Sequence, residues 1–581
     1  MQLYLEKNSM VPMRDGVRLA TDVYRPAEHG RWPVLVARHL YSKDKRFPGE
    51  YEHVRLESTL NIRQMVEAGY VVVVQDARGR YASEGDFVPF LLDAEDGADT
   101  VAWAAAQPWS TGQVGMYGAS YQALAQWQTA IAQPEALRAL SVSQSPHAFG
   151  IYPYQGGAFQ PAFVLPWVLA SVAPEEMRRR VEQGRATAAD MEALTQAVSE
   201  LRACIEHLPA IDQPVLCEAA PYYLEWLAHP DYDVYWQATR PNDFYGRVQV
   251  PVLTISGWYD VFLRNDLRHY QEMKARGGSE LARQQQHLII GPWAHGNFQM
   301  GYPDRRFGEA VSPQAVRALS DFQIRWFDHW LKGIENGIER EKPVHLFVMG
   351  VDQWRDEEAW PLPDTQYRPY YLQSQGHANT ADGDGLLSPC VSEHAAFDTY
   401  CYDPHNPVPT ASGIIWGDPG PYDQRAVEER DDVLCYTTPP LEQPLEVTGP
   451  VELVVYVSSS ARDTDYTGKL VDIYPDGRAV LLTDGILRAR YRESFSHPTF
   501  LEPGRVYELR LDLGATSNVF QPGHRVRLEV SSSNFPRFDR NSNTGGVIAT
   551  EREDDFVTAM QRVYHGREYP SRLILPVIER V

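Results

Sequence analysis

The segment from Gly112 to Ile131, GQVGMYGASYQALAQWQTAI, decides the fold class. It places Ser120 between a β-type run and a helix-type run that begins at Tyr121. A serine at a sharp strand-to-helix turn projects its hydroxyl above the sheet edge, beside the helix N-terminus where an anion is stabilised. Gly118 fits the G-x-S-x-G pattern, but Gln122 stands in place of the second glycine. An ordinary Gly-Ser turn is the alternative interpretation.

Near-continuous apolar runs on both sides of this segment predict a parallel sheet that is covered on both faces. These runs are Val34 to Ala37, Val71 to Gln75, Val114 to Tyr117, Ala139 to Val142, Val250 to Ser256 and His287 to Ile290. The long interruption before Val250 predicts an insertion into one α/β domain.

The insertion, residues 146–241, is predicted to be a helical cap. Its apolar residues recur at steps of three and four, which lines one helix face; they are Met191, Leu194, Val198, Leu201, Ile205 and Leu208. After the second half of the α/β domain, Ser312 and Pro313 offer an N-cap and a first helical residue. We expect a long helix there that ends near Gly337.

The pattern changes beyond about residue 343. Period-two runs such as VELVVYVSSS and RVRLEVSSS, separated by turn residues, predict an all-β sandwich or jelly roll. The expected organisation is therefore an α/β domain in two parts (1–145 and 242–342), the cap (146–241) and a β domain (343–581).

Composition excludes several classes of partner. The chain of 581 residues carries 54 Lys+Arg against 77 Asp+Glu, a net charge of −23, which disfavours nucleic acid and anionic membrane surfaces. The longest nearly apolar run, Pro161 to Ala173, is too short to span a bilayer. The first residues contain no apolar region followed by a cleavage site, so we expect no signal peptide and a cytoplasmic protein.

No metal or organic cofactor is expected. The 5 cysteines lack C-x-x-C spacing, and the chain has no H-E-x-x-H, Walker A or G-x-G-x-x-G pattern. Asp463, Asp465 and Asp472 lack the regular calcium-loop spacing and are interpreted as turn and face residues.

An acid and a base follow Ser120 in the order that a nucleophile-elbow hydrolase requires. Asp260 follows the strand-like VPVLTIS in GWYDVFL, and His295 follows HLII in GPWAHGNF. Each therefore falls where a strand ends and a loop begins. Alone, Asp260 could equally be a helix cap and His295 a loop histidine; the three placements together predict a Ser-His-Asp triad.

These motifs resemble the cocaine-esterase and Xaa-Pro dipeptidyl-peptidase family of serine hydrolases. The resemblance rests on GASY, GWYD, GPWAHG and RWFDHWLKG, and extends to MRDGVRLATDVYRP, QDARGRYASEGDF and LVDIYPDGRAVLLTDGILRARYR. It implies an α/β-hydrolase domain with an inserted helical cap, followed by a jelly-roll sandwich. It also implies that the jelly roll walls the active-site cleft and offers a homodimer surface.

The resemblance carries over specific residues. It implies Ser120, Asp260 and His295 as the triad, with the Tyr41 hydroxyl and the backbone N–H of Tyr121 as the oxyanion hole. Two positions depart from the family pattern, because Ala123 stands for a glycine and Leu40 for a proline. We expect Ala123 to tighten the packing beneath the elbow and Leu40 to loosen the loop of Tyr41.

Phe262 and Trp167 resemble in placement the aromatic residues that enclose the acyl group in cocaine-esterase-like enzymes. Both could instead be packing residues. In QDARGRYASEGDF, Asp76 and Arg78 are expected to brace a loop rather than to bind an anion.

The predicted activity is hydrolysis of small-molecule acyl esters, or of amides, through an acyl-enzyme. A dipeptidyl-peptidase and an α-amino acid ester hydrolase or β-lactam acylase are alternatives. They need carboxylates near the triad for a substrate ammonium, and Asp231 and Asp233 of the cap are the candidates, although a charged surface loop is the other interpretation of these two residues. A non-catalytic binding scaffold is the alternative of another class.

Overall fold

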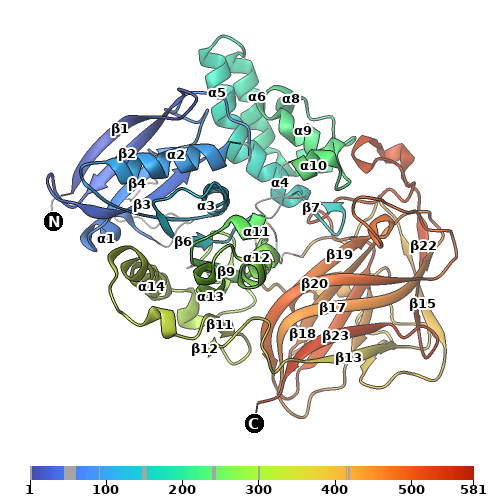
Figure 1. Cartoon of the computed structure of the whole chain (residues 1–581). Coiled ribbons are helices and arrows are strands. Elements are labelled where there is room, and N and C mark those ends of the chain that lie inside the picture. Colours follow the sequence, from blue (N-terminus) through green and yellow to red (C-terminus); the bar gives the residue numbers. More distant parts are fainter. Residues whose placement is uncertain are drawn as a thin grey trace.

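The computed structural model describes residues 3–44, 60–89, 92–146, 153–238, 244–298, 301–411, 413, 415 and 419–580. Figure 1 shows three parts: an α/β part that contains the N-terminus, a group of helices beside it, and a β-rich part that contains the C-terminus. All seven candidate site residues named above lie in the described ranges.

A ten-stranded sheet forms the centre of the α/β part, in the order β1-β2-β4-β3-β5-β6-β9-β10-β11-β12. Neighbouring strands from β4 to β11 are parallel, and the strands at both edges are antiparallel. The six predicted strands are confirmed within it. The bounds are β1 Tyr4–Pro12, β2 Arg18–Arg25, β3 Trp32–His39, β4 Val71–Asp76, β5 Ser110–Ala119, β6 Leu137–Ser143, β9 Val252–Tyr259, β10 Gln286–Ala294, β11 Val344–Val348 and β12 Gln353–Glu357.

Helices cover this sheet, as near-continuous burial of its strands requires. They are α1 Ile62–Glu67, α2 Asp93–Ala106, α3 Tyr121–Ile131, α11 Phe244–Arg247, α12 Leu263–Arg276, α13 Glu280–Gln284 and α14 Pro313–Lys332. The side chain of Ser312 caps α14 by accepting from the N–H of Ala315, as predicted. The predicted end near Gly337 is wrong, because Gly333 adopts the left-handed conformation (φ 68°) that terminates the helix.

The inserted segment between β6 and β9 forms the cap. It contains α4 Pro161–Trp167, the π-helical turn η1 Val168–Val172, α5 Ala173–Glu182, α6 Ala188–Ser199, α7 Leu201–Glu206, α8 Pro214–Ala219, α9 Pro221–Ala228 and α10 Val234–Ala238, with a short hairpin of β7 Tyr154–Gln155 and β8 Ala158–Phe159. The apolar run expected on one helix is divided between α6 and α7 at Glu200, and Leu208 lies beyond α7. Val198 is exposed, so periodicity alone overestimated the buried face.

The C-terminal part is an all-β sandwich. Its strands are β13 Gln366–Gln373, β14 Leu386–Ser388, β15 Ala396–Tyr402, β16 Leu434–Thr437, β17 Leu445–Ser459, β18 Asp465–Ile473, β19 Ala479–Arg488, β20 Tyr507–Phe520, β21 Arg525–Ser531, β22 Ala559–His565 and β23 Arg572–Ile578. The boundary expected at residue 343 needs correction, because β11 and β12 belong to the ten-stranded sheet. A short apolar run does not reveal which sheet it joins.

One continuous hydrophobic core joins the α/β and β parts. The same cluster contains Leu288 of β10, Trp258 of β9 and Leu453 of β17. The indole N–H of Trp258 donates to the carbonyl of Phe347 at 2.7 Å, and the hydroxyl of Tyr259 donates to that of Leu481 at 3.3 Å. Through Tyr259, the strand that precedes Asp260 is therefore packed against the β domain, whereas Phe347 lies in β11 of the same sheet.

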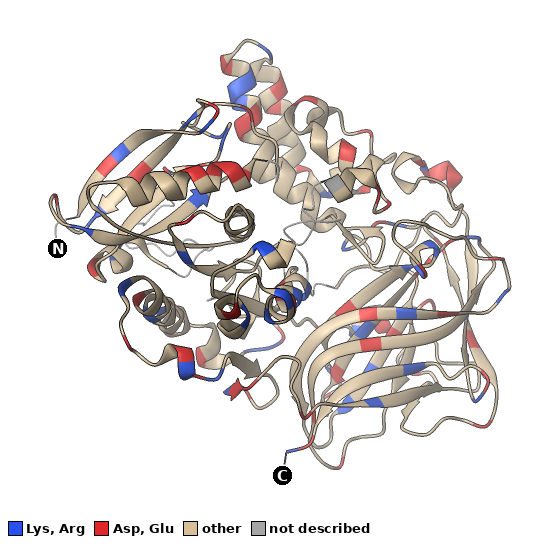
Figure 2. Ribbon diagram, viewed as in Figure 1, with Lys and Arg blue, Asp and Glu red and all other residues tan. Residues whose placement is uncertain are grey.

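Charged residues of both signs are scattered over all three parts (Figure 2). Within the described ranges, no helix combines the length and apolarity that crossing a bilayer requires.

Candidate active site

Ser120 lies in a strained turn between β5 and α3. Its backbone has φ 58° and ψ −125°, a conformation that non-glycine residues adopt rarely and chiefly at functional sites. Gly118 has φ 135°, and a Cβ there would lie 2.3 Å from Oε1 of Gln122. The side chain of Gln122 therefore occupies the space beside Gly118 that a larger residue would fill. A glycine is needed at position 118, and glutamine can stand two residues after the serine, because the two side chains would otherwise collide.

The serine, histidine and acid predicted from sequence lie together at the carboxyl ends of β5, β10 and β9. Nε2 of His295 is 3.1 Å from Oγ of Ser120, and its Nδ1 is 2.9 Å from Oδ2 of Asp260. The other oxygen of Asp260 accepts from the N–H of Phe262 at 2.7 Å. With Nδ1–H donating to the carboxylate, Nε2 is left to accept the serine proton.

The two predicted oxyanion donors follow the carboxyl ends of two neighbouring parallel strands, β3 and β5. Tyr121 is the first residue of α3, so its backbone N–H belongs to the helix N-terminus, and its hydroxyl donates to Asp93 at 2.5 Å. Tyr41 follows β3, and its hydroxyl oxygen accepts from the indole N–H of Trp167 at 3.0 Å. The cap therefore reaches the Tyr41 side chain directly.

Comparison with known proteins places the chain in a family. The model of the X-Pro dipeptidyl-peptidase (S15) family matches residues 15–297, and that of the X-Pro dipeptidyl-peptidase C-terminal non-catalytic domain matches residues 336–574. Cocaine esterase from Rhodococcus sp. (strain MB1 Bresler) is 43% identical over 99% of this chain and 98% of its own. The chain belongs to the cocaine esterase and X-Pro dipeptidyl-peptidase family.

Solved structures agree with this membership over the whole chain. An aminopeptidase from a Thaumarchaeota archaeon of marine sediment has a TM-score of 0.82 and 25% identity, covering 99% of this chain and 97% of that one. An α-amino acid ester hydrolase has a TM-score of 0.80 and 26% identity, covering 99% and 96%. This member of the family is an enzyme, a serine hydrolase of carboxylic esters.

Aromatic rings surround the imidazole of this hydrolase. The Phe262 ring meets the His295 ring edge-to-face at 5.0 Å, and Phe163 of α4 meets Phe262 in the same way at 5.2 Å. Trp167 lies one helical turn after Phe163 and stacks on Trp226 at 6.3 Å. Sequence reasoning missed Phe163, although its i,i+4 spacing from Trp167 was the available signal.

Both departures from the family pattern are accommodated by burial. Ala123 is fully buried in the core beneath α3, where its methyl group packs. Leu40 is also fully buried, in the cluster that contains Trp167, and its carbonyl accepts from Nε of Arg80 at 3.3 Å. The expected loosening of the Tyr41 loop is therefore opposed by the burial of Leu40 and by the bond from Arg80 to its carbonyl.

Asp76, at the end of β4, holds the same loop through the N–H of Lys43, which donates to its carboxylate at 2.7 Å. Its side chain is fully buried, and this burial raises the pKa of Asp76 to about 6. Arg78 pairs with Asp96 of α2 at 2.6 Å and with Asp15. These contacts agree with the bracing role expected for Asp76 and Arg78.

Asp76 is expected to make the free energy of unfolding depend on pH. Between about pH 4 and pH 6 the folded state keeps a proton on Asp76 that the unfolded chain releases, so stability falls as pH rises. Across this window the free energy of unfolding of the wild type should fall by on the order of 3 kcal/mol relative to that of Asp76→Asn. Urea-denaturation midpoints of both proteins at several pH values measure this, and parallel pH curves would contradict it.

The acidic residues considered for binding a substrate ammonium are engaged elsewhere. Asp231 accepts from the Tyr491 hydroxyl of the β domain at 2.6 Å, and Asp233 bonds to Nδ1 of His229 at 2.6 Å. The aspartates considered for a calcium site also have protein partners: Asp463 and Asp465 pair with Arg490 and Arg488 inside the β domain, and Asp472 lies 2.8 Å from Nδ1 of His524. These contacts give all five carboxylates structural roles.

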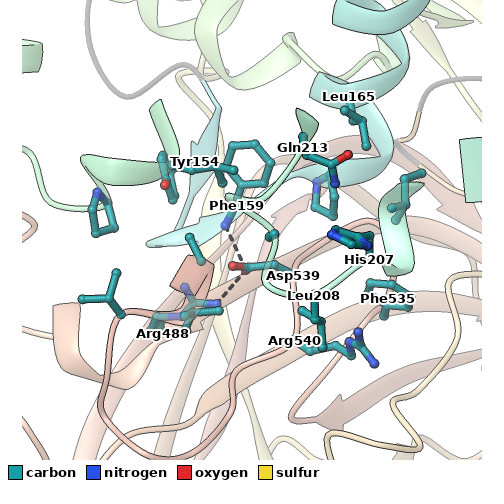
Figure 3. A pocket seen from close by; sticks show the side chains of 18 of the residues that line it. Tyr154, Phe159, Leu165, His207, Leu208, Gln213, Arg488, Phe535, Asp539 and Arg540 are labelled. Carbon is teal, nitrogen blue, oxygen red and sulfur yellow. Dashed lines mark hydrogen bonds and ion pairs between the residues drawn. The ribbon is translucent and has the colours of Figure 1, made fainter. Parts of the chain in front are cut away.

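A separate cavity of about 60 Å³ lies where the cap meets the β domain (Figure 3). Asp539 lies against it, accepting from the N–H of Phe159 at 3.0 Å and from Arg488 at 2.7 Å. None of the candidate site residues lines this cavity. These bonds attach the β8 hairpin of the cap to the β domain.

Proposed function

We propose that the protein hydrolyses neutral esters of small or aromatic carboxylic acids, with Ser120 as nucleophile, His295 as general base and Asp260 as the carboxylate that orients it. The observation that carries this proposal is the pair of contacts at the two nitrogens of His295, 3.1 Å to Ser120 and 2.9 Å to Asp260. Such a relay is what activates a weak hydroxyl nucleophile.

In this mechanism Nε2 of His295 takes the proton of Ser120 as Oγ attacks the ester carbonyl carbon. The tetrahedral oxyanion is stabilised by the Tyr41 hydroxyl and the N–H of Tyr121. Collapse expels the alcohol, which receives the proton from His295, and leaves the acyl group on Oγ. Water, deprotonated by the same imidazole, then attacks the acyl carbon. Collapse of this second tetrahedral intermediate breaks the bond to Oγ, which regains the proton from His295, and releases the acid.

The neutral acyl group is inferred from the walls of the site. Phe163 and Phe262 present aromatic surface beside His295, which suits an apolar acyl group. An α-ammonium substrate needs a carboxylate partner, and Asp231 and Asp233 are committed to Tyr491 and His229. The relative named cocaine esterase, an ester hydrolase by name, supports the same substrate class.

A substrate panel tests this proposal. We expect p-nitrophenyl acetate, butyrate and benzoate to be hydrolysed at least about 100-fold faster, in kcat/KM, than α-amino acyl p-nitroanilides, a difference of roughly 3 kcal/mol. To separate acyl specificity from ester reactivity, the panel includes the p-nitrophenyl ester of alanine. Faster turnover of that ester than of the butyrate would contradict the neutral acyl pocket and favour an α-amino acid ester hydrolase.

A further inference from the structure

Arg80, the second arginine of the sequence RGR, is a fully buried cation that the mechanism above does not use. Its guanidinium donates to three backbone carbonyls: Nε to Leu40 at 3.3 Å, Nη1 to Val172 at 3.0 Å and Nη2 to Ser171 at 3.3 Å. The rings of Phe87 and Tyr81 also lie close to it, with centroids 5.0 and 5.4 Å from its guanidinium carbon. Because burying a cation is costly unless other groups compensate, the three carbonyls and the two rings together stabilise Arg80 in this position.

The three carbonyls belong to two segments that otherwise lie far apart in the chain. Leu40 directly precedes Tyr41, whereas Ser171 and Val172 end the π-helical turn η1, which starts directly after Trp167. Short π-helical turns are frequent at functional sites. Arg80 therefore ties the loop of the oxyanion tyrosine to the part of the cap that carries Trp167.

The same two segments are also joined directly, by a hydrogen bond between Trp167 and Tyr41. The indole N–H of Trp167 donates to the hydroxyl oxygen of Tyr41, so one lone pair of that oxygen is occupied from the cap side. The acceptor bond restricts where the hydroxyl proton can point and polarises the O–H group. The aim of the Tyr41 hydroxyl thus depends on the distance between the two segments that Arg80 joins.

We propose that Arg80 is a positioning residue of the oxyanion hole, which fixes the cap turn after Trp167 to the loop of Tyr41 and so holds the Tyr41 hydroxyl in its catalytic direction. This inference rests on the proposed role of Tyr41. Arg80 does not touch the substrate. Its effect on the reaction passes through the placement of one hydrogen-bond donor, for which misplacement by about 1 Å costs on the order of 100-fold.

The matched control is Arg179 of α5, which also joins the cap to the segment after β4. Its guanidinium donates to the carbonyls of Ser83 and Gly85 at 3.3 and 3.4 Å, so it makes the same kind of bond between the same parts of the protein. It contacts neither Leu40 nor the π-helical turn in any of these bonds. A general loosening of the cap would affect Arg179→Met and Arg80→Met alike.

The test measures kcat and KM for p-nitrophenyl butyrate per active site, with sites counted by titration with diethyl p-nitrophenyl phosphate. We expect Arg80→Met to lower kcat by about 10- to 100-fold with KM changed by less than about threefold, because only a transition-state contact is lost. Arg179→Met should stay within about threefold of wild type. Arg80→Lys, which keeps the charge without the planar fork, should fall between wild type and Arg80→Met.

A double-mutant cycle with Tyr41→Phe separates the possible causes. Tyr41→Phe alone should lower kcat by about 10²- to 10³-fold. In that background Arg80→Met should cost less than about threefold more, because its target is already gone. Arg80→Lys takes its place if Arg80→Met yields no folded protein.

Two results would overturn the inference, and they differ in meaning. If the fold-loss of kcat in the double variant equals the product of the losses from Tyr41→Phe and Arg80→Met, Arg80 acts independently of Tyr41. In that case only the positioning role fails. If Tyr41→Phe leaves kcat unchanged, the assignment of Tyr41 to the oxyanion hole fails, and the role of Arg80 fails with it.

Discussion

Replacing Ser120 with alanine is expected to lower kcat for p-nitrophenyl butyrate by about 10⁵- to 10⁶-fold, because no acyl-enzyme can form without Oγ. The fold should survive, since serine and alanine share a Cβ and the strained φ of 58° is imposed by the surrounding turn. Stopped-flow release of p-nitrophenol should show no burst, while circular dichroism and the Tm remain those of the wild type.

Ser145→Ala is the matched control for this variant. Ser145 is also a buried serine just after a strand of the same sheet, but its hydroxyl donates to the carbonyl of Pro146. We expect its kcat to stay within about threefold of wild type, as for removal of one neutral hydrogen bond outside the reacting groups. A normal burst from Ser120→Ala would show that another group is the nucleophile.

Asp260→Asn is expected to lower kcat by about 10⁴-fold, the cost of presenting the wrong histidine tautomer. The amide would donate toward Nδ1 of His295, 2.9 Å away in the wild type, and so place the ring proton on Nε2. That nitrogen could then no longer accept the proton of Ser120. The shape of the site would be almost unchanged, which isolates the effect of the proton.

Asp266→Asn provides the contrast, because Asp266 is also a fully buried carboxyl near the triad. Its oxygens accept from the N–H of Ser145 and the hydroxyl of Ser256. Burial, with a contribution from the charge of Asp260, raises the pKa of Asp266 well above its ordinary value, so the neutral acid is favoured and an amide resembles it. We expect kcat to fall less than tenfold, because exchanging a carboxylic acid for an amide with similar hydrogen-bonding groups costs little free energy. Equal losses from the two variants would remove the distinction between them.

Local patterns were sufficient to predict much of this molecule. Buried parallel strands are apolar along their whole length, which is why the run at Val71 was recognisable, and the elbow at Ser120 combines a strand, a turn and a helix within a few residues. The order of Asp260 and His295 after the serine follows from the topology of the sheet. The family resemblance added Tyr41, Phe262 and Trp167.

Features that depend on tertiary contacts were not predictable in this way. The partners of Arg80 are backbone carbonyls, which carry no sequence signal, and they come from segments 40 and 91 or 92 positions away. The allocation of Val344–Val348 to the first sheet depends on which neighbour is available for pairing. Gly333 and Gly337 both adopt left-handed conformations, so composition could not decide which one ends the last helix.

The hydrophobic core shared by the first sheet and the β domain limits how modular this enzyme can be. Trp258 and Tyr259 precede the acid Asp260 and bond to carbonyls of Phe347 and Leu481. A chain ended after β12 would keep the first sheet but lose Leu481 and the other β-domain side chains of this core, and with them the support of the strand that precedes Asp260. The β domain is thus a structural part of the hydrolase rather than an appended module. The α/β part and the β domain must therefore be expressed and engineered as one unit.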